Sequence, residues 1–381
     1  MKISQLILDN IKNRSEREFE PYYLCDTQKI RQQCQQFHAL TYPEKSIHFA
    51  TMANNHPEFL RIVKEEGIRV FVNSLLHLDA VSRAGFEAEE IIFTSSGLTE
   101  KVMKTIAKQG VQVNLDSPMQ LERWRKLFPD KKVGIRCNIG NSVRPFATHA
   151  GFFIGENSRL GFTENEIRDI PDKSKIRGLH LYAGTDIFNV DYFMNCYREL
   201  IRFADYFPEL EYLNMGGGFG VAENGGEMFD FNEYNLRLTE LMEEASKHTK
   251  KRLKLILEPG RIIGGEAGYF VCCVTDIKHR GDKRLIGVNA STVQFSRPLL
   301  YPDIAKHPVL VVRNGTVINE SETVCSTIFG CSTYSRDIFR ENAQLPVIEP
   351  GDTLLFCNAG SYSASTYLHF LGFPKPDEFF V

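Results

Sequence analysis

The residues best suited to chemistry form a glycine run and a short acidic-to-basic turn. In the run, Gly216, Gly217 and Gly218 follow one another, so backbone N–H groups can approach an anion without interference from side chains. Further along, Glu258 is followed by Pro259, Gly260 and Arg261, which places a fixed positive charge just after a tight turn. Arg261 could donate a charge-assisted hydrogen bond to a phosphate. The simpler interpretations, a flexible turn and an ordinary salt bridge, stay open for these residues.

The elements that position these motifs repeat along most of the chain. From residue 46 a short apolar run, a turn and a charged stretch of helical period alternate, which predicts strands alternating with helices. We expect eight strands, at residues 46–52, 69–73, 90–94, 111–115, 132–138, 178–182, 211–215 and 254–258. Eight such units favour an α/β fold of the (β/α)8 TIM barrel type over an open sheet. The two motifs then follow strands seven and eight, where such barrels often hold phosphate.

A second domain is expected after the barrel. Beyond residue 265 the sequence changes to β-branched runs broken by Gly, Pro and Asp, at 309–312, 322–328 and 353–356, with little helical period. A lone strand at 22–24 is expected to join this all-β domain. The predicted domains are therefore a barrel at 27–265 and a β-domain made of 1–26 and 266–381.

Composition excludes several classes of protein. A net charge of -3 over 381 residues provides no broad basic surface, so we expect no nucleic-acid partner. The nine cysteines lack metal-ligand spacing and are interpreted as reduced thiols, which predicts a cytoplasmic protein without a metal site. No apolar run is long enough to span a membrane.

The glycine run and the Glu-Pro-Gly-Arg turn together resemble the ornithine, diaminopimelate and carboxynorspermidine decarboxylases. These are pyridoxal phosphate (PLP) enzymes with an alanine-racemase-type barrel and a C-terminal β-domain. Further similar motifs occur in the family's order, at residues 158–162, 178–181, 360–362 and 370–374. The resemblance implies a carbon–carbon lyase acting on an amino acid, as a homodimer with sites at its interface.

Carried over by position, the resemblance assigns cofactor-binding residues. The phosphate would be held by the glycine run, Gly260, Arg261, Thr185 and Tyr362. Glu258 would face the pyridine nitrogen and keep it protonated, so that the ring can withdraw electrons from the substrate. Arg136, Tyr334 and Asp337 would contact the substrate; rim salt bridging is the alternative for Arg136.

The sequence departs from the family at its central residue. The family's lysine ends the first barrel strand, and Met52 stands there in this chain, between residues that keep their family places. A thioether has no amine, so it can form no Schiff base with PLP and cannot move the usual proton. We therefore expect PLP, if bound, to be held non-covalently.

Other catalytic positions differ as well. Thr333 stands where the family has a catalytic cysteine, and Tyr182 where it has a histidine that stacks on the cofactor. His180 lies on an apolar strand and is either a core histidine or a catalytic residue. Because several positions differ together while the phosphate motifs persist, we interpret Met52 as natural divergence.

Three functions remain compatible with these residues. The first is a diverged decarboxylase-like protein that binds PLP, or a similar phosphorylated ligand, without a bond to lysine. The second is a catalytically silent binding or regulatory paralogue of a decarboxylase. The third is a barrel enzyme that uses a different phosphorylated ligand.

Overall fold

The computed structural model describes residues 3–15, 19–145, 151–222, 226, 228–281, 283–305, 307–318 and 322–381. The chain forms two compact units. The barrel unit comprises Arg31–Gly220 and Met228–Gly260, and the β unit comprises Met1–Ile30, Val221–Glu227 and Arg261–Val381. The predicted domain limits lie a few residues from these divisions and stay a prediction.

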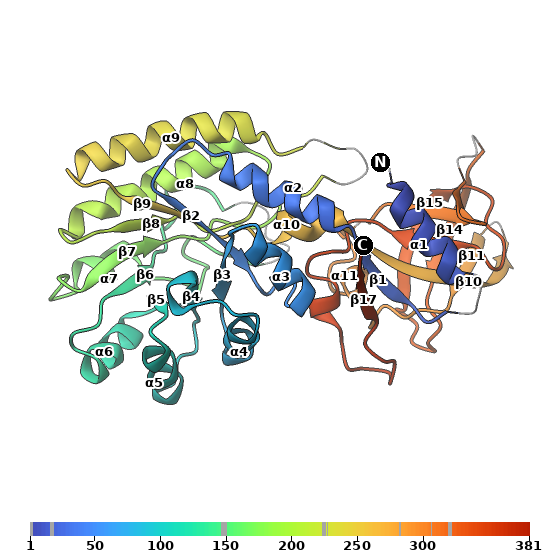
Figure 1. Cartoon of the computed structure of the whole chain (residues 1–381), viewed down its shortest axis with the longest axis horizontal. Helices are drawn as coiled ribbons and strands as arrows, with labels where there is room; N and C mark the ends of the chain where they lie inside the picture. Colours follow the sequence, from blue (N-terminus) through green and yellow to red (C-terminus); the bar gives the residue numbers. More distant parts are fainter. Residues whose placement is uncertain are drawn as a thin grey trace. The chain divides into compact units, whose positions relative to one another are not determined.

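The barrel unit confirms the predicted (β/α)8 architecture. Within the described residues, parallel strands close in the order β2 to β9 (Figure 1). Each lies within two residues of its predicted limits, as β2 Lys45–Ala50, β3 Arg69–Val72, β4 Ile91–Thr94, β5 Gln112–Leu115, β6 Val133–Arg136, β7 Ile176–His180, β8 Tyr212–Asn214 and β9 Lys254–Leu257. The helices along this part of the chain are α2 Thr27–His38, α3 Pro57–Glu65, α4 Leu75–Arg83, α5 Glu100–Gln109, α6 Pro118–Leu127, α7 Glu164–Arg168, α8 Val190–Arg202 and α9 Phe231–His248.

Local sequence explains where these helices begin and which face they bury. Ser74, Thr99 and Ser117 precede α4, α5 and α6, and each side chain accepts a hydrogen bond from a backbone N–H of the first turn. Along α8, Phe193 and Tyr197 are buried four residues apart, which is the spacing of one helix face. Polar capping residues therefore determine where α4, α5 and α6 begin, and the apolar stripe of α8 determines which face of that helix is buried.

The middle of the barrel contains a large buried side chain, that of Tyr212, in a cluster with Ile92 and Ile256. A Cβ atom on Gly178 would lie 1.8 Å from Cζ of Tyr212, and one on Gly134 would lie 2.1 Å from the Tyr212 hydroxyl oxygen. The hydroxyl donates to Oδ1 of Asn114 at 2.9 Å. Glycines on β6 and β7 thus make room for the tyrosine of β8, and the interior is a packed core rather than a channel.

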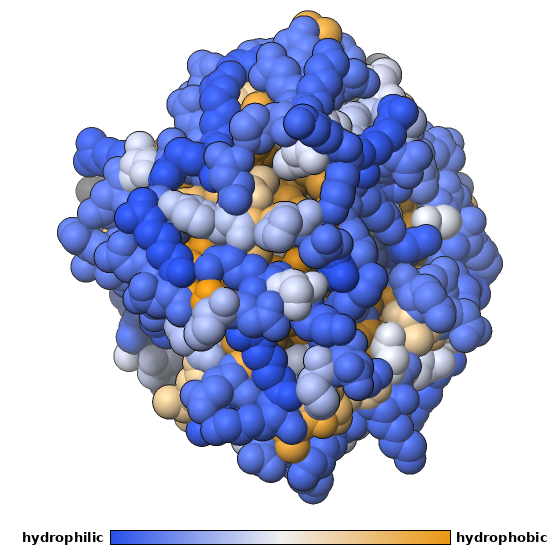
Figure 2. All heavy atoms as spheres, turned by 90° about the vertical axis from the view of Figure 1, so that its left-hand side faces the viewer, coloured by the Kyte–Doolittle hydropathy of each residue, from blue (hydrophilic) through white to orange (hydrophobic). Residues whose placement is uncertain are grey.

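Ion pairs lie at the end of the barrel where the strands begin. Arg177, at the start of β7, pairs with Glu209 at 2.6 Å and with Glu211 at 3.5 Å, and Lys132 pairs with Glu211 at 3.0 Å. Figure 2 shows this end, which hydrophilic side chains cover with small apolar areas between them. In barrels of this type this end contributes stability, and the chemistry lies at the opposite end.

The β unit confirms the predicted all-β domain. Its sheet has the order β13-β12-β16-β10-β11-β14-β15, and β1 pairs with β10 and β17. The strands are β1 Tyr22–Cys25, β10 Gly268–Arg280, β11 Lys283–Val288, β12 Val309–Arg313, β13 Thr316–Val317, β14 Val324–Phe329, β15 Ile338–Leu345, β16 Thr353–Phe356 and β17 Asp377–Phe380. The pairing of β1 with β10 confirms that the lone N-terminal strand joins this domain.

Short helices also belong to the β unit: α1 Gln5–Ser15, α10 Arg261–Gly264 and α11 Arg297–Leu300. The sequence did not predict α1, whose Ile7 and Ile11 are fully buried in a cluster with Leu24 and Val271. Within the described ranges, no helix has the length and apolar character needed to cross a membrane.

Candidate functional site

A polar arc lines the end of the barrel at which the strands finish. Five neighbouring strands, β5 to β9, contribute Asp116, Arg136, His180, Asn214 and Glu258 at or just after their last residues. Arg136 is the Cα partner of His180, and His180 that of Asn214. Four of the five are buried, and the Arg136 side chain is 12% exposed. Because these strands are parallel and adjacent, charged and hydrogen-bonding groups gather at one rim.

Glu258 is the most strongly held member of the arc. Its Oε1 accepts from Nδ2 of Asn214 at 2.6 Å, and its Oε2 lies 3.2 Å from Nε2 of His180. Burial alone would raise the pKa of Glu258, but the charge and hydrogen bond of His180, with the Asn214 bond, outweigh burial and lower the pKa below its usual value. The rim therefore keeps a buried carboxylate anion.

The same contacts bear on the role of His180. Its Nε2 is engaged with Glu258, whereas its buried Nδ1 has no hydrogen-bond partner among the residues that the structure describes. A core histidine would normally have both nitrogens satisfied. His180 thus holds Glu258 and keeps one unused nitrogen.

The glycine run is required by close packing. Added Cβ atoms would collide with backbone oxygens of the loops and strands on either side, at 2.2 Å for Gly216, 2.2 Å for Gly217 and 2.4 Å for Gly218, against Leu181, Glu258 and Gly184. Gly216 and Gly218 also have φ angles of 70° and 109°, which disfavour a side chain. A larger residue here would displace the ends of β7 and β9.

The backbone N–H groups of the run are not all available to an anion. The Gly216 N–H donates to Oδ1 of Asn214 at 3.0 Å. The N–H groups of Gly217 and Gly218 donate to no acceptor within the described part of the chain. Two successive free N–H groups form an anion-binding concavity. The candidate cradle therefore consists of two donors, where the sequence suggested three.

Met52 lies just beyond the end of β2, beside this arc. The Ala50 N–H donates to the Pro259 carbonyl at 2.9 Å, which joins the end of β2 to the residue after Glu258. The Met52 side chain is partly buried, and its sulfur lies 3.8 Å from Oγ1 of Thr51. Met52 and Glu258 thus follow neighbouring strands at the same rim, and the role of position 52 stays a prediction.

Tyr182 and Thr185 belong to the loop after β7. The Tyr182 ring packs edge-on against Phe153, with centroids 4.8 Å apart and planes at 82°. Thr185 follows Gly184, and a Cβ atom added to Gly218 would lie 2.4 Å from the carbonyl oxygen of Gly184. This loop therefore lies against the glycine run. The sequence did not indicate Phe153, because it lies in an irregular segment far from Tyr182 along the chain.

Arg136 and Asp116 form the outer part of the arc. Nε of Arg136 lies 3.9 Å from Oδ1 of Asp116. Burial lowers the pKa of Arg136, while Asp116 and Glu258 oppose that effect. The rim salt bridge considered for Arg136 is present, and a substrate contact stays a prediction.

Two phosphate-binding candidates lie in the β unit. Arg261 begins α10 and is buried, and Tyr362 has a left-handed φ of 51°. Gly360 packs against the end of α10, because a Cβ on Gly360 would lie 2.0 Å from the Gly264 carbonyl oxygen. The turn that carries Tyr362 therefore lies beside the helix that begins with Arg261. Gly260 is also buried, at the end of the barrel unit.

The loop that follows β14 is organised by Asp337. Oδ1 accepts from the N–H and hydroxyl of Thr292 at 2.7 and 2.8 Å, and Oδ2 accepts from the N–H and hydroxyl of Ser332 at 3.0 and 2.5 Å. Thr333 is exposed, and Tyr334 packs edge-on against Phe370 at 5.9 Å. Asp337 thus has a structural role in the β unit; its role in substrate binding stays a prediction.

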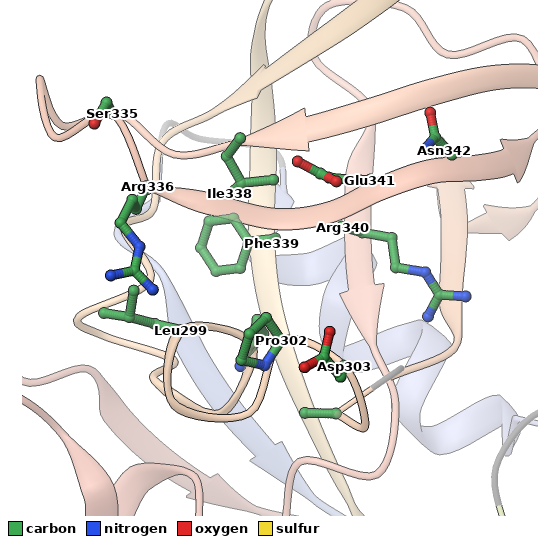
Figure 3. A pocket seen from close by; sticks show the side chains of 12 residues that line it. Leu299, Pro302, Asp303, Ser335, Arg336, Ile338, Phe339, Arg340, Glu341 and Asn342 are labelled. Carbon is green, nitrogen blue, oxygen red and sulfur yellow. The ribbon is translucent and has the colours of Figure 1, made fainter.

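The β unit also has a pocket of about 520 Å³ that the sequence did not indicate. Figure 3 shows Phe339 and Pro302 between Arg336 on one side and Arg340 on the other, with Leu299 below Arg336. Its lining contains none of the candidate residues above, so it is separate from the predicted site. No set of His, Cys, Asp or Glu side chains within the described ranges is arranged to hold a metal ion.

Comparisons with known proteins agree on one family. A family model described as "Pyridoxal-dependent decarboxylase, pyridoxal binding domain" matches residues 27–265. Diaminopimelate decarboxylase of Methanothermobacter thermautotrophicus is 28% identical over 378 residues, covering 95% of this chain and 86% of that protein.

Solved structures show the same fold. The Helicobacter pylori diaminopimelate decarboxylase complexed with L-lysine gives a TM-score of 0.83 at 22% identity, over 96% of this chain and 92% of that one. The Vibrio vulnificus lysine/ornithine decarboxylase complexed with putrescine gives 0.83 at 20% identity, over 100% and 99%.

Proposed function

The chain belongs to the pyridoxal-dependent decarboxylase family, and from this membership we propose that it binds PLP non-covalently at the barrel rim and acts on an amino-acid-like substrate. The buried Glu258 anion beside two free backbone N–H groups is the observation that carries the proposal. A protonated pyridine nitrogen needs an anionic acceptor, and a phosphate needs donors in a concave arrangement. The residues of the barrel unit therefore fit both ends of this cofactor.

Each residue has a proposed task toward the bound cofactor. Gly217 and Gly218 would donate to the phosphate, with Thr185 as a further candidate in the barrel unit, and the phosphate roles of Arg261 and Tyr362 stay predictions from the resemblance. Glu258 would accept the ring N–H. When bound, PLP supplies an electron-withdrawing ring that stabilises negative charge on the substrate's α-carbon.

Position 52 decides how the cofactor is retained. Met52 offers an apolar thioether where the family has an amine, so this side chain can neither attach PLP covalently nor act as a base. We propose that affinity rests on the phosphate and ring contacts alone. The protein would then release PLP when free cofactor is removed.

Dialysis distinguishes the two modes of retention. After saturation with PLP and extensive dialysis, the native chain should lose the cofactor. Borohydride, which reduces a Schiff base to a stable bond, should then leave no PLP label covalently attached to the protein. The variant Met52→Lys should retain PLP and carry the label on residue 52. A native chain labelled by borohydride at any lysine of the rim would contradict non-covalent binding, and a failure of both proteins to bind PLP would favour a different phosphorylated ligand.

A second function, a catalytically silent binding or regulatory protein, is favoured by one observation. Position 52 has no amine and position 333 has no thiol, so two reactive groups of the family are absent together. Release of labelled CO2 from a panel of carboxyl-labelled basic amino acids distinguishes the two: measurable turnover by the native chain with PLP would exclude a silent protein. We also propose that the protein is a cytoplasmic homodimer; sedimentation equilibrium can test the dimer.

A further inference from the structure

Asn214 connects two parts of the rim that bind opposite ends of the proposed ligand. It is fully buried at the end of β8. Its Nδ2 donates to Oε1 of Glu258 at 2.6 Å, and its Oδ1 accepts from the Gly216 N–H at 3.0 Å. The Glu258 N–H in turn donates to the Gly216 carbonyl at 2.7 Å. Three residues from two strand ends and the glycine run are therefore closed into one hydrogen-bonded ring.

The side-chain amide of Asn214 satisfies both contacts at once. The amide offers a donor and an acceptor in fixed directions, whereas an aspartate offers two acceptors and a leucine offers neither. With Asn214 on Oε1 and His180 facing Oε2, each oxygen of Glu258 keeps a further lone pair for a ligand. The carboxylate is thus fixed in orientation without being saturated.

We propose that Asn214 is a positioning residue that couples the ring-nitrogen acceptor Glu258 to the phosphate-binding glycine run, through its bonds to Glu258 and to Gly216. This inference rests on the proposed function, because it concerns how the two ends of the same ligand site are held together. Gly216 precedes the two free N–H groups of Gly217 and Gly218, so a change at Asn214 reaches both the orientation of the phosphate donors and the charge of Glu258.

The substitution Asn214→Asp tests the charge part of this coupling. It keeps an acceptor for the Gly216 N–H but replaces the donor to Glu258 with a second carboxylate. Losing the hydrogen bond from Asn214 and gaining a neighbouring negative charge both raise the pKa of Glu258. The other titratable groups that face Glu258 are His180 on β7, His48 on β2, Arg136 on β6 and Tyr212 on β8. None of them is altered by the substitution.

Asn114 on β5 provides a matched control. It is also a fully buried asparagine of the barrel interior, with its Oδ1 accepting from Tyr212 and its Nδ2 donating to Thr94. Asn114→Asp therefore introduces the same charge without touching Glu258 or the glycine run. If Asn214→Asp folds poorly, combining it with Glu258→Gln restores a donor–acceptor pair with its direction reversed, and this double variant should melt at a higher temperature than Asn214→Asp alone.

Two measurements separate this inference from the proposed function. In protein labelled with 13C at the Glu carboxyl carbons, with Glu258→Gln identifying the signal, Asn214→Asp should move the Glu258 titration upward by at least about one pH unit, and Asn114→Asp should not. Binding of pyridoxine 5′-phosphate, followed by calorimetry, should weaken at least tenfold from pH 8 to pH 6 in Asn214→Asp and less than threefold in the native chain and Asn114→Asp.

The outcomes are distinct. An unshifted Glu258 titration, an unchanged pH profile or a double variant no more stable than Asn214→Asp would overturn the coupling, while native binding of pyridoxine 5′-phosphate would still support the proposed function. If Asn214→Asp shifts the Glu258 titration but the native chain binds no pyridoxine 5′-phosphate, Asn214 would still be the residue that fixes Glu258, and both the proposed ligand and the coupling to it would be overturned.

Discussion

Replacing Glu258 with glutamine removes the buried charge while nearly preserving the shape of the site. The glutamine oxygen can still accept from Nδ2 of Asn214, which donates to Oε1 in the native chain at 2.6 Å. Its amide then faces Nε2 of His180. Because Nδ1 of His180 has no partner in the described ranges, the ring proton can move there and leave Nε2 as an acceptor. We therefore expect the fold to lose only about 1 kcal/mol.

The loss in ligand binding should be larger than the loss in stability. A hydrogen bond to a charged group contributes about 1.5–3 kcal/mol, and each 1.4 kcal/mol corresponds to about a tenfold change in affinity. Glu258→Gln should therefore bind pyridoxine 5′-phosphate about 10-fold to 140-fold more weakly. Inorganic phosphate, which has no ring nitrogen, should bind the variant and the native chain within threefold of each other.

Calorimetric titration at pH 7.5 measures both ligands, and Glu211→Gln is the matched control because Glu211 is exposed at the opposite end of the barrel. Acid unfolding gives a second measurement of what the Glu258 charge contributes, in this case to stability. The folded-state pKa of Glu258 is lowered, so its contribution to stability is present above the usual carboxyl pKa and is lost as the pH falls below it. Equal affinity of Glu258→Gln and the native chain for pyridoxine 5′-phosphate would refute the assignment of Glu258 as the ring-nitrogen acceptor.

Three further predictions concern the barrel core, the loop after β14 and turnover. Gly178→Ala should destabilise the protein by about 3 kcal/mol or more, because its Cβ would lie 1.8 Å from the Tyr212 ring, whereas Gly97→Ala, with open space around it, should leave the melting temperature unchanged. Asp337→Asn should cost about 2–4 kcal/mol in chemical denaturation, because an amide group would replace one of two oxygens that each accept two hydrogen bonds. Met52→Lys with Thr333→Cys should release CO2 from at least one basic amino acid at a rate well above that of Met52→Lys alone, since a threonine hydroxyl is too weak an acid to donate the proton; equal rates would exclude position 333 as the donor.

The strands were predictable because each leaves a local signal. A short apolar run followed by a turn and an amphipathic stretch defines each βα unit without long-range information, and all eight barrel strands lie within two residues of their expected limits. Helix α1 was missed although Ile7 and Ile11 have the four-residue spacing of one helix face, because its segment carries acids and bases in near-equal number; the contacts show that this face is buried.

The candidate site was predictable in its residues and less so in its contacts. The glycine run and Glu258 follow from type and order along the chain. That the Gly216 N–H is taken by Asn214 depends on the side-chain conformation of a residue two positions earlier, which no pattern of types specifies. The glycine requirement also has another cause than expected, since Gly217 packs against the backbone oxygen of Glu258 at a Cβ distance of 2.2 Å. Gly217→Asp would therefore disturb β9 and cannot serve as a selective test of phosphate binding.

The hydrogen-bond partners of Glu258 indicate which ligand contacts this chain keeps although Met52 replaces the family's lysine. Burying a carboxylate is unfavourable unless hydrogen bonds and opposite charge offset the loss of water. This chain supplies that offset from two strands, through His180 and Asn214, and the pKa of Glu258 is lowered despite its burial. The barrel itself needs no anion at this position, because a glutamine could accept from Asn214 and donate to His180 without the desolvation penalty. We infer that the rim still serves a ligand with a protonated ring nitrogen, and that Met52 changes how such a ligand is attached and not whether its ring is recognised.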